Sequence, residues 1–139
     1  MEKADLDWGN LGFAYQETPK RYVSNWKDGT WDTGGLTEEA TISLNESACV
    51  LQYAQTCFEG LKAYSTKDGH IVCFRPDLNA QRMADSCRRM VMPVFPEQRF
   101  LTAVEDTVAA NASFVPPYGY GASLYLRPLA KISRQRGAD

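Results

Sequence analysis

The stretch FEGLKAYSTKDGHIVCFRPDLNAQRM, residues 58–83, determines the fold more clearly than any other part of this chain. Its segments 61–66 and 70–74 have the composition of strands, and the tripeptide KDG between them is a turn signal. Pro76 then suits the first position of a helix, because its missing N–H would have no partner there. The stretch therefore predicts a hairpin followed by a helix.

Toward the N-terminus, RYVSNWKDGTW (residues 21–31) contains a second hairpin signal. Asp28 and Gly29 stand between aromatic and β-branched residues, as in a two-residue turn. Residues 40–44, ATISL, have the composition of a further strand.

We expect a short helix over residues 48–58, ACVLQYAQTCF. The side-chain oxygen of Ser47 would cap this helix by accepting a hydrogen bond from a free backbone N–H. Gly60 would end it by adopting a positive φ.

After Pro76, apolar side chains recur at helical spacing in two segments. The first stripe contains Met83, Cys87, Met90 and Val91, and the second contains Phe100, Leu101, Val104, Val108 and Ala112. SLYLR, residues 123–127, follows as a strand. The pattern predicts a mixed α/β (α+β-like) domain with a largely antiparallel sheet and two main helices.

Composition excludes several classes of function. The 139 residues suffice for one domain, and the net charge of −2 comes without a basic stripe, so we expect no nucleic-acid partner. No apolar stretch approaches the ~20 residues that span a bilayer. The four cysteines and the single histidine lack the spacing of a zinc site, which indicates reduced core cysteines in a cytoplasmic protein without a metal.

A few side chains are candidates for binding. Strand alternation places Tyr125 and Arg127 on one face, which suits a carboxylate, although the pattern alone favours a solvated sheet face. Arg82 lies off the apolar stripe of its helix and could bind a phosphate, but most helix arginines are simply solvated. Tyr53 and Phe58 could line an apolar pocket, yet aromatic residues beside a turn more often belong to the core.

No catalytic group emerges from the pattern itself. Lys62 can form imines in principle, but its position on a strand opposite apolar neighbours indicates an exposed lysine. His70 sits beside a turn, away from any serine or cysteine nucleophile motif. Neither GxGxxG nor a Walker-type loop occurs.

Three ordered motifs resemble those of a known family. YAQTCFEGLKAY (residues 53–64), FRPDLNAQRM (74–83) and GASLYLRP (121–128) are similar to the small domain of the branched-chain amino acid aminotransferases, which are fold type IV pyridoxal-phosphate enzymes. LGFAY and WKDGTW also fit this family. The resemblance covers nearly everything from residue 11 to residue 128.

The resemblance implies roles that local pattern does not assign. It implies that Arg82 binds the phosphate group of the cofactor pyridoxal 5'-phosphate. It implies substrate-binding positions at Tyr53, Phe58, Tyr125, Arg127 and Phe13. The implied reaction is amino transfer between leucine, isoleucine or valine and 2-oxoglutarate, carried out by a homodimer.

The same resemblance bounds what the chain is expected to do alone. Residues 1–128 correspond to the small domain, residues 129–139 form a polar tail unlike the family, and the large domain with the cofactor-binding lysine is expected to be absent. No catalytic residue is therefore expected here, and the chain alone should be inactive and prone to self-association. The alternatives are a non-catalytic binding or regulatory fragment that docks on a full-length subunit, and another fold type IV enzyme, such as a D-amino acid aminotransferase or aminodeoxychorismate lyase.

Overall fold

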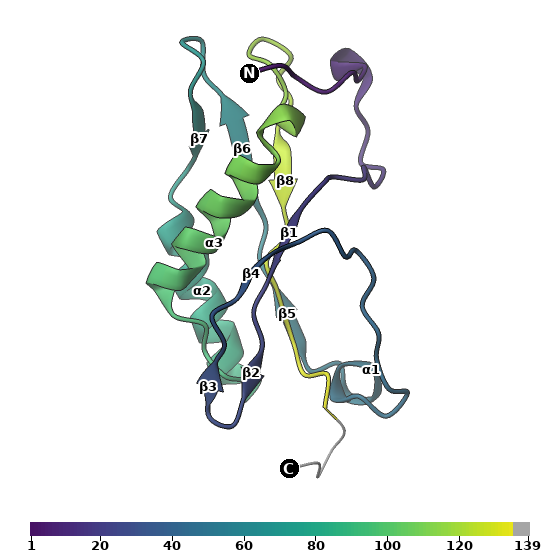
Figure 1. Cartoon of the computed structure of the whole chain (residues 1–139). Coiled ribbons are helices and arrows are strands. Elements are labelled where there is room, and N and C mark those ends of the chain that lie inside the picture. Colours follow the sequence, from purple (N-terminus) through teal and green to yellow (C-terminus); the bar gives the residue numbers. More distant parts are fainter. Residues whose placement is uncertain (135–139) are drawn as a thin grey trace.

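The computed structural model describes residues 1–134 (Figure 1). In chain order the elements are the short 3-10 helix η1 (Trp8–Asn10), β1 (Arg21–Val23), β2 (Trp26–Lys27), β3 (Thr30–Trp31), β4 (Gly35–Thr37), α1 (Cys49–Tyr53), β5 (Thr56–Phe58), β6 (Leu61–Ser65), β7 (Ile71–Cys73), α2 (Pro76–Arg89), α3 (Glu97–Ala110), the 3-10 helix η2 (Ala112–Phe114), β8 (Leu124–Leu126) and β9 (Leu129–Lys131). Every strand pair is antiparallel. The predicted fold class, a mixed α/β domain with antiparallel sheets and two main helices, is confirmed.

The central sheet has the strand order β7-β6-β8 and is covered on one face by α2 and α3 (Figure 1). Side chains alternate along β6, so that Leu61 and Ala63 are buried while Lys62 and Tyr64 are exposed. Leu126 of β8 is buried on the same face. The hairpin predicted from residues 58–83 is confirmed, and its open face is the one that carries the candidate site.

The core lies between this sheet and the two long helices. Among its buried residues are Met83 and Cys87 of α2 and Phe100, Val104 and Val108 of α3, which confirms most of the two predicted stripes.

Val91 departs from the first stripe because α2 ends before it. The residue adopts a left-handed φ of 56° and is 83% exposed. Its N–H donates to Arg88 O at 3.2 Å, and the N–H of Met92 donates to Cys87 O at 2.8 Å. These two bonds form a Schellman ending, which turns the Val91 side chain away from the core.

The N-terminal hairpin packs on the helical layer. Asp28 and Gly29 have φ values of 53° and 80°, as a primed two-residue turn requires, which confirms the predicted turn. The indole Nε1 of Trp31 donates to Val94 O at 2.9 Å. Arg99 of α3 donates to Asp32 O at 2.6 Å, so the C-terminal end of β3 is tied to α3 and to the segment between the two long helices.

Three local predictions are wrong. Helix α1 covers only Cys49–Tyr53, since Ala54 adopts a left-handed φ of 52° and the chain continues into β5. The Ser47 hydroxyl donates to Asn45 Oδ1 and does not cap the helix. Residues 40–44 form no strand, because the partner of β1 is β4, which precedes them.

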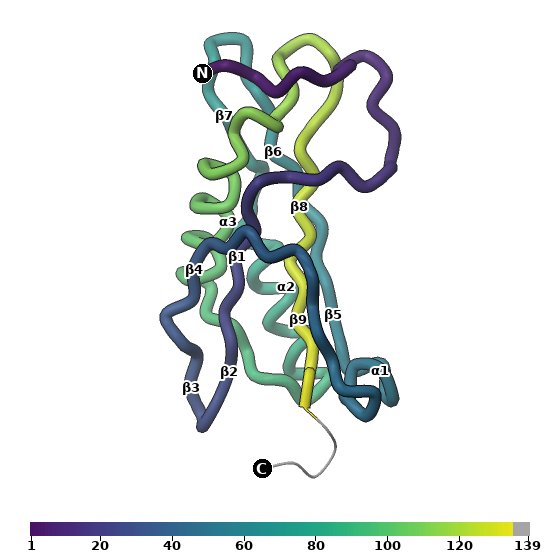
Figure 2. Tube along the Cα trace, turned by 45° about the vertical axis from the view of Figure 1, so that its right-hand side comes forward, coloured from purple at the N-terminus to yellow at the C-terminus, as the bar shows by residue number. Residues whose placement is uncertain are grey.

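The pairing of β5 with β9 explains why the helix stops early. Thr56, Cys57 and Phe58 pair with residues 129–131, and Figure 2 shows the two strands running side by side. The first residues of the segment expected to be a polar tail therefore belong to the sheet structure, and Ala130 packs against the core. Residues 135–139 of that segment lie outside the described residues.

Candidate functional site

The FEG turn, which comprises Phe58, Glu59 and Gly60, connects β5 to β6 at the centre of the site. Gly60 is not among the glycines with positive φ, so the prediction that it ends a helix in that conformation is wrong. A Cβ at Gly60 would lie 2.3 Å from the hydroxyl oxygen of Tyr125 and 3.0 Å from Cζ of that ring. The close approach of a side chain from β8 therefore favours glycine here, since any larger residue would displace the Tyr125 ring.

Phe58, Tyr125 and Arg127 form the aromatic–arginine cluster. Cζ of Arg127 lies 4.2 Å from the centroid of the Phe58 ring and 5.2 Å from that of Tyr125, a range in which ring faces attract a cation. Nε and Nη2 of Arg127 also donate to Tyr125 Oη at 3.2 and 3.1 Å. The predicted placement of Tyr125 and Arg127 on one exposed strand face is confirmed, and their substrate role stays a prediction.

The cluster retains the donors that a carboxylate needs. Within the described residues, Nη1 of Arg127 makes no hydrogen bond, and the side chain lies at the surface. The Phe58 and Tyr125 side chains are 58% and 48% exposed. A carboxylate could thus bind the free edge of the guanidinium while an apolar group contacts the two rings.

Arg82 is held by a buried acid that sequence reasoning missed. Its Nε donates to Glu59 Oε1 at 2.7 Å and its Nη2 donates to Glu59 Oε2 at 2.6 Å. The Glu59 side chain is 3% exposed, whereas that of Arg82 is 69% exposed. Hydrogen bonding to Arg82, followed by that to Asn79, holds the pKa of Glu59 below its usual value despite the opposing effect of burial, and the same pair raises the pKa of Arg82.

Asn79, also missed, joins α2 to the FEG turn. Its Nδ2 donates to Glu59 Oε2 at 2.9 Å and to Gly60 O at 3.1 Å. Asn79 and Arg82 are three residues apart and so share one face of α2. This spacing predicts that the two side chains share a partner, but only the packing of α2 shows that the partner is the FEG turn.

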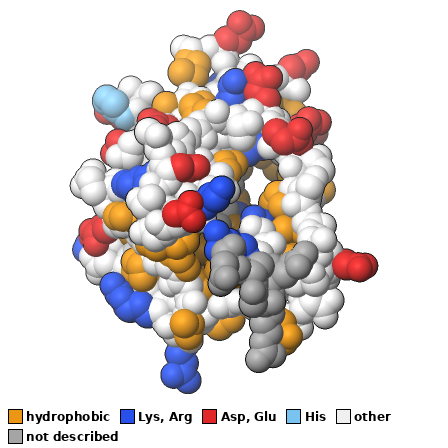
Figure 3. Space-filling view, turned by 60° about the horizontal axis from the view of Figure 1, so that its bottom comes forward, with side chains coloured by type: hydrophobic (Ala, Val, Ile, Leu, Met, Phe, Trp, Pro, Cys, Tyr) orange, Lys and Arg blue, Asp and Glu red, His pale blue; other side chains and the backbone are white. Residues whose placement is uncertain are grey.

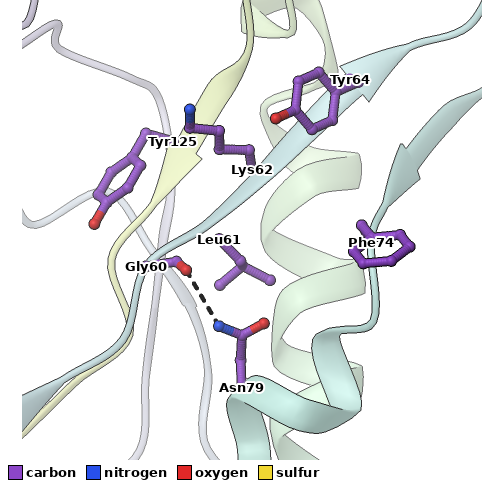
Figure 4. Close-up of a pocket in the computed structure, with 7 residues that line it drawn as sticks. All are labelled: Gly60, Leu61, Lys62, Tyr64, Phe74, Asn79 and Tyr125. Atoms are coloured by element: carbon purple, nitrogen blue, oxygen red, sulfur yellow. Dashed lines mark hydrogen bonds between the residues drawn. The ribbon is translucent and has the colours of Figure 1, made fainter.

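A shallow depression of about 220 Å³ opens beside the turn. It is lined by Gly60, Leu61, Lys62, Tyr64, Phe74, Asn79 and Tyr125. In Figure 4 the Asn79 amide points to Gly60 O from below, while Lys62 and Tyr64 extend from β6. Lys62 is exposed opposite Tyr125 in the sheet, which agrees with its interpretation as a strand lysine.

Two of the predicted substrate residues, Tyr53 and Phe13, come from segments that do not contribute to the aromatic–arginine cluster. Tyr53 is the last residue of α1, at the end of the molecule opposite the N-terminal segment, and is 57% exposed (Figure 1). Phe13 belongs to the N-terminal segment and is fully exposed, so its ring packs against none of the cluster residues. Their pocket roles stay predictions.

Other chemistry is limited in the described part of the chain. Residues 1–134 contain no group of three or more histidine, cysteine or acidic residues that could hold a metal ion, and all four cysteines are free. No helix in the same range has the length and apolar character needed to cross a membrane. His70 pairs with Asp68 at 2.9 Å on the surface.

Comparisons with known proteins converge on one family. No protein-family model matches the chain. It is 51% identical over 124 residues to the branched-chain-amino-acid aminotransferase of Haemophilus influenzae, an alignment that covers 89% of this chain and 36% of that protein. Relatives with similar names include chloroplastic and mitochondrial proteins of plants.

Solved structures agree with the sequence relatives. The branched-chain aminotransferase of Thermoproteus uzoniensis with norvaline superposes with a TM-score of 0.59 at 25% identity, over 84% of this chain and 35% of that one. The branched-chain amino acid aminotransferase of Thermobaculum terrenum, in its PLP form, gives 0.58 at 29% identity, over 84% and 34%.

The matches cover most of this chain but only about a third of each relative's length. The chain is therefore homologous to the N-terminal part of the branched-chain amino acid aminotransferases.

Proposed function

We propose that these residues form the small-domain wall of a cofactor and substrate site in a branched-chain amino acid transaminase. The observation that carries this proposal is that Arg82 and the aromatic–arginine cluster both meet at the FEG turn. The reaction would be reversible amino transfer between leucine, isoleucine or valine and 2-oxoglutarate.

Arg82 is proposed to bind the phosphate of pyridoxal 5'-phosphate. Two of its N–H groups are used on Glu59, and the remaining N–H groups belong to a side chain that is 69% exposed. Planar guanidinium donors suit phosphate oxygens, so the residues present fit the group. When bound, the cofactor supplies the electron sink that amino transfer requires.

The aromatic–arginine cluster is proposed to bind the substrate. The free edge of Arg127 would pair with a carboxylate, and the hydroxyl of Tyr125 would orient the guanidinium. Phe58 would contact the aliphatic side chain, together with Tyr53 and Phe13. A purely apolar pocket distinguishes substrates by only ~1–3 kcal/mol per methylene, so leucine, isoleucine and valine should all be accepted.

These residues alone are proposed not to turn over substrate. Lys62 is exposed on the sheet and does not match the cofactor-binding lysine of the family. That lysine is expected in the portion of the relatives that this chain does not cover. Incubating the purified chain with leucine, 2-oxoglutarate and pyridoxal phosphate should give no glutamate above the protein-free rate. Steady glutamate production that scales with protein concentration would contradict the proposal.

A non-catalytic docking fragment is the second candidate, favoured by the exposed apolar surface. Large exposed side chains include Phe74 at 86% and Phe58 at 58%. Figure 3 shows hydrophobic side chains emerging between charged ones on the end of the molecule turned toward the viewer. Such surface commonly marks an interface, so we propose self-association or docking on a longer subunit. Light scattering at rising concentration should show species larger than 15.6 kDa, and a constant monomer mass would count against this candidate.

We place the parent protein in the cytoplasm. The four free cysteines of this chain fit a reducing compartment, whereas some relatives are chloroplastic or mitochondrial. Cell fractionation followed by immunoblotting tests this, and recovery with an organelle would contradict it.

A further inference from the structure

Glu59 is an unusual residue for its position, because a carboxylate is seldom buried without a purpose. Its side chain is 3% exposed, and a buried charge is tolerated only when it is paired and hydrogen-bonded. The side-chain partners are Arg82 and Asn79, and both come from one face of α2. The acid therefore faces the helix, although it belongs to the turn that carries Phe58 and Gly60.

The contact engages one particular edge of the Arg82 guanidinium. Nε and Nη2 bond the two carboxylate oxygens at 2.7 and 2.6 Å, in a parallel two-bond arrangement. No hydrogen bond in the described residues involves Nη1. An arginine otherwise has several freely rotating bonds, so this arrangement fixes the direction in which the Nη1 edge points.

We propose that Glu59 is a positioning residue, which holds Arg82 by its Nε edge so that the Nη1 edge is presented to a phosphate oxygen. This inference rests on the proposed cofactor role of Arg82. Asn79 fixes the carboxylate from the side, since its amide bonds both Glu59 Oε2 and Gly60 O. The turn that shapes the substrate wall thereby also sets the orientation of the phosphate-binding arginine.

A different account would make Glu59 a competitor that neutralises Arg82. The two accounts differ for Glu59→Asp, which keeps the negative charge but shortens the side chain by one methylene. A competitor withdrawn by one methylene would hold Arg82 less tightly and should leave phosphate affinity unchanged or increase it. A positioning residue that can no longer reach both Nε and Nη2 should weaken it.

The first readout needs no ligand. In ¹⁵N–¹H spectra of the full chain, the Nε proton of Arg82, assigned by its loss in Arg82→Lys, should exchange with water on the order of tenfold more slowly than that of Arg89, the protection expected of a hydrogen bond to a charged group. Arg89 makes no hydrogen bond within the described residues. Glu59→Asp should bring the Arg82 proton to the Arg89 rate.

The second readout is titration with inorganic phosphate, followed through the Arg82 resonances. Glu59→Asp should raise the phosphate Kd about two- to tenfold, the factor expected when one long side chain must be ordered on binding. Asp77→Glu is the matched control, because Asp77 holds Arg75 through Nε and Nη2 at 3.0 and 2.8 Å on the exposed first turn of the same helix. That variant should change neither Arg82 readout.

The inference is overturned if the Arg82 Nε proton of the wild type exchanges as fast as that of Arg89. It is also overturned if Glu59→Asp frees this proton and leaves the phosphate Kd unchanged or lower. A wild-type Arg82 that is protected but does not respond to phosphate would instead refute the proposed cofactor role, so the two failures are distinguishable.

Discussion

Replacing Gly60 with alanine tests the geometry that joins the FEG turn to β8. The new methyl group would lie 2.3 Å from Oη and 3.0 Å from Cζ of Tyr125, distances at which one group must move. The clash falls on the hydroxyl end of a half-exposed side chain that can shift, so its cost should lie in the lower part of the about 1–3 kcal/mol that overpacking of a core costs. Because the φ of Gly60 is not positive, alanine recovers about 0.4–1 kcal/mol by restricting the unfolded chain. The free energy of unfolding should therefore fall by about 0–1 kcal/mol.

A double-mutant cycle separates this contact from other effects. Urea unfolding would be measured for Gly60→Ala, Tyr125→Ala and the double variant. With the tyrosine ring removed, the Gly60 substitution should no longer destabilise the protein. Gly35→Ala is the matched control, since a Cβ there meets nothing within 4 Å and the residue also lacks a positive φ. A coupling energy below about 0.5 kcal/mol, the scatter of independent sites, would refute the contact.

Three further predictions concern buried polar groups. Asn111→Ala should destabilise the protein by about 1–3 kcal/mol in urea unfolding, because the buried amide bonds both the N–H and the C=O of Lys20; an unchanged midpoint would contradict this. The folded pKa of Glu59 lies below its unfolded value near 4.5, so the stabilisation from this carboxylate is present above that pH and is lost as the pH falls through the folded pKa. The difference in free energy of unfolding between the wild type and Arg82→Ala should therefore narrow below pH 4.5. A difference that does not change with pH would contradict this. Burial raises the pKa of the Cys87 thiol to about 12, so iodoacetamide should label this thiol at pH 8 only when the protein unfolds. Peptide mass mapping measures the labelling, and labelling of Cys87 in the native protein at the rate of a free thiol would contradict this prediction.

Local chemistry was enough to predict several elements. The turn at Asp28 and Gly29 needs residues that tolerate positive φ, and the sequence supplies them at adjacent positions. Alternation along β6 and β8 depends only on strand geometry, so the exposed face with Tyr125 and Arg127 followed directly from SLYLR.

Elements that depend on distant partners were not predictable in this way. Residues 56–58 are predicted as helix because they follow a helical segment, although Thr and Phe suit a strand; they form β5 because residues 129–131 pair with them. The role of Gly60 depends on a tyrosine 65 positions later, and nothing near the glycine indicates that contact. In both cases the partner that decides the structure is distant in the sequence.

The buried Glu59 illustrates the same limit within the site. An acid next to a glycine in a turn is ordinarily exposed, and only the packing of α2 against the turn makes it the partner of Asn79 and Arg82. The family resemblance pointed to Arg82 but not to the residue that orients it.

Exchange of the corresponding region between family members tests the central claim most directly. Residues 1–128 of this chain would replace the matching part of the Haemophilus influenzae branched-chain-amino-acid aminotransferase, to which the chain is 51% identical over the aligned region. The measurement is glutamate formation from 2-oxoglutarate with leucine, isoleucine or valine as the amino donor. We predict that the chimera transaminates all three. A folded chimera that binds pyridoxal phosphate but transfers no amino group from any of them would contradict the account.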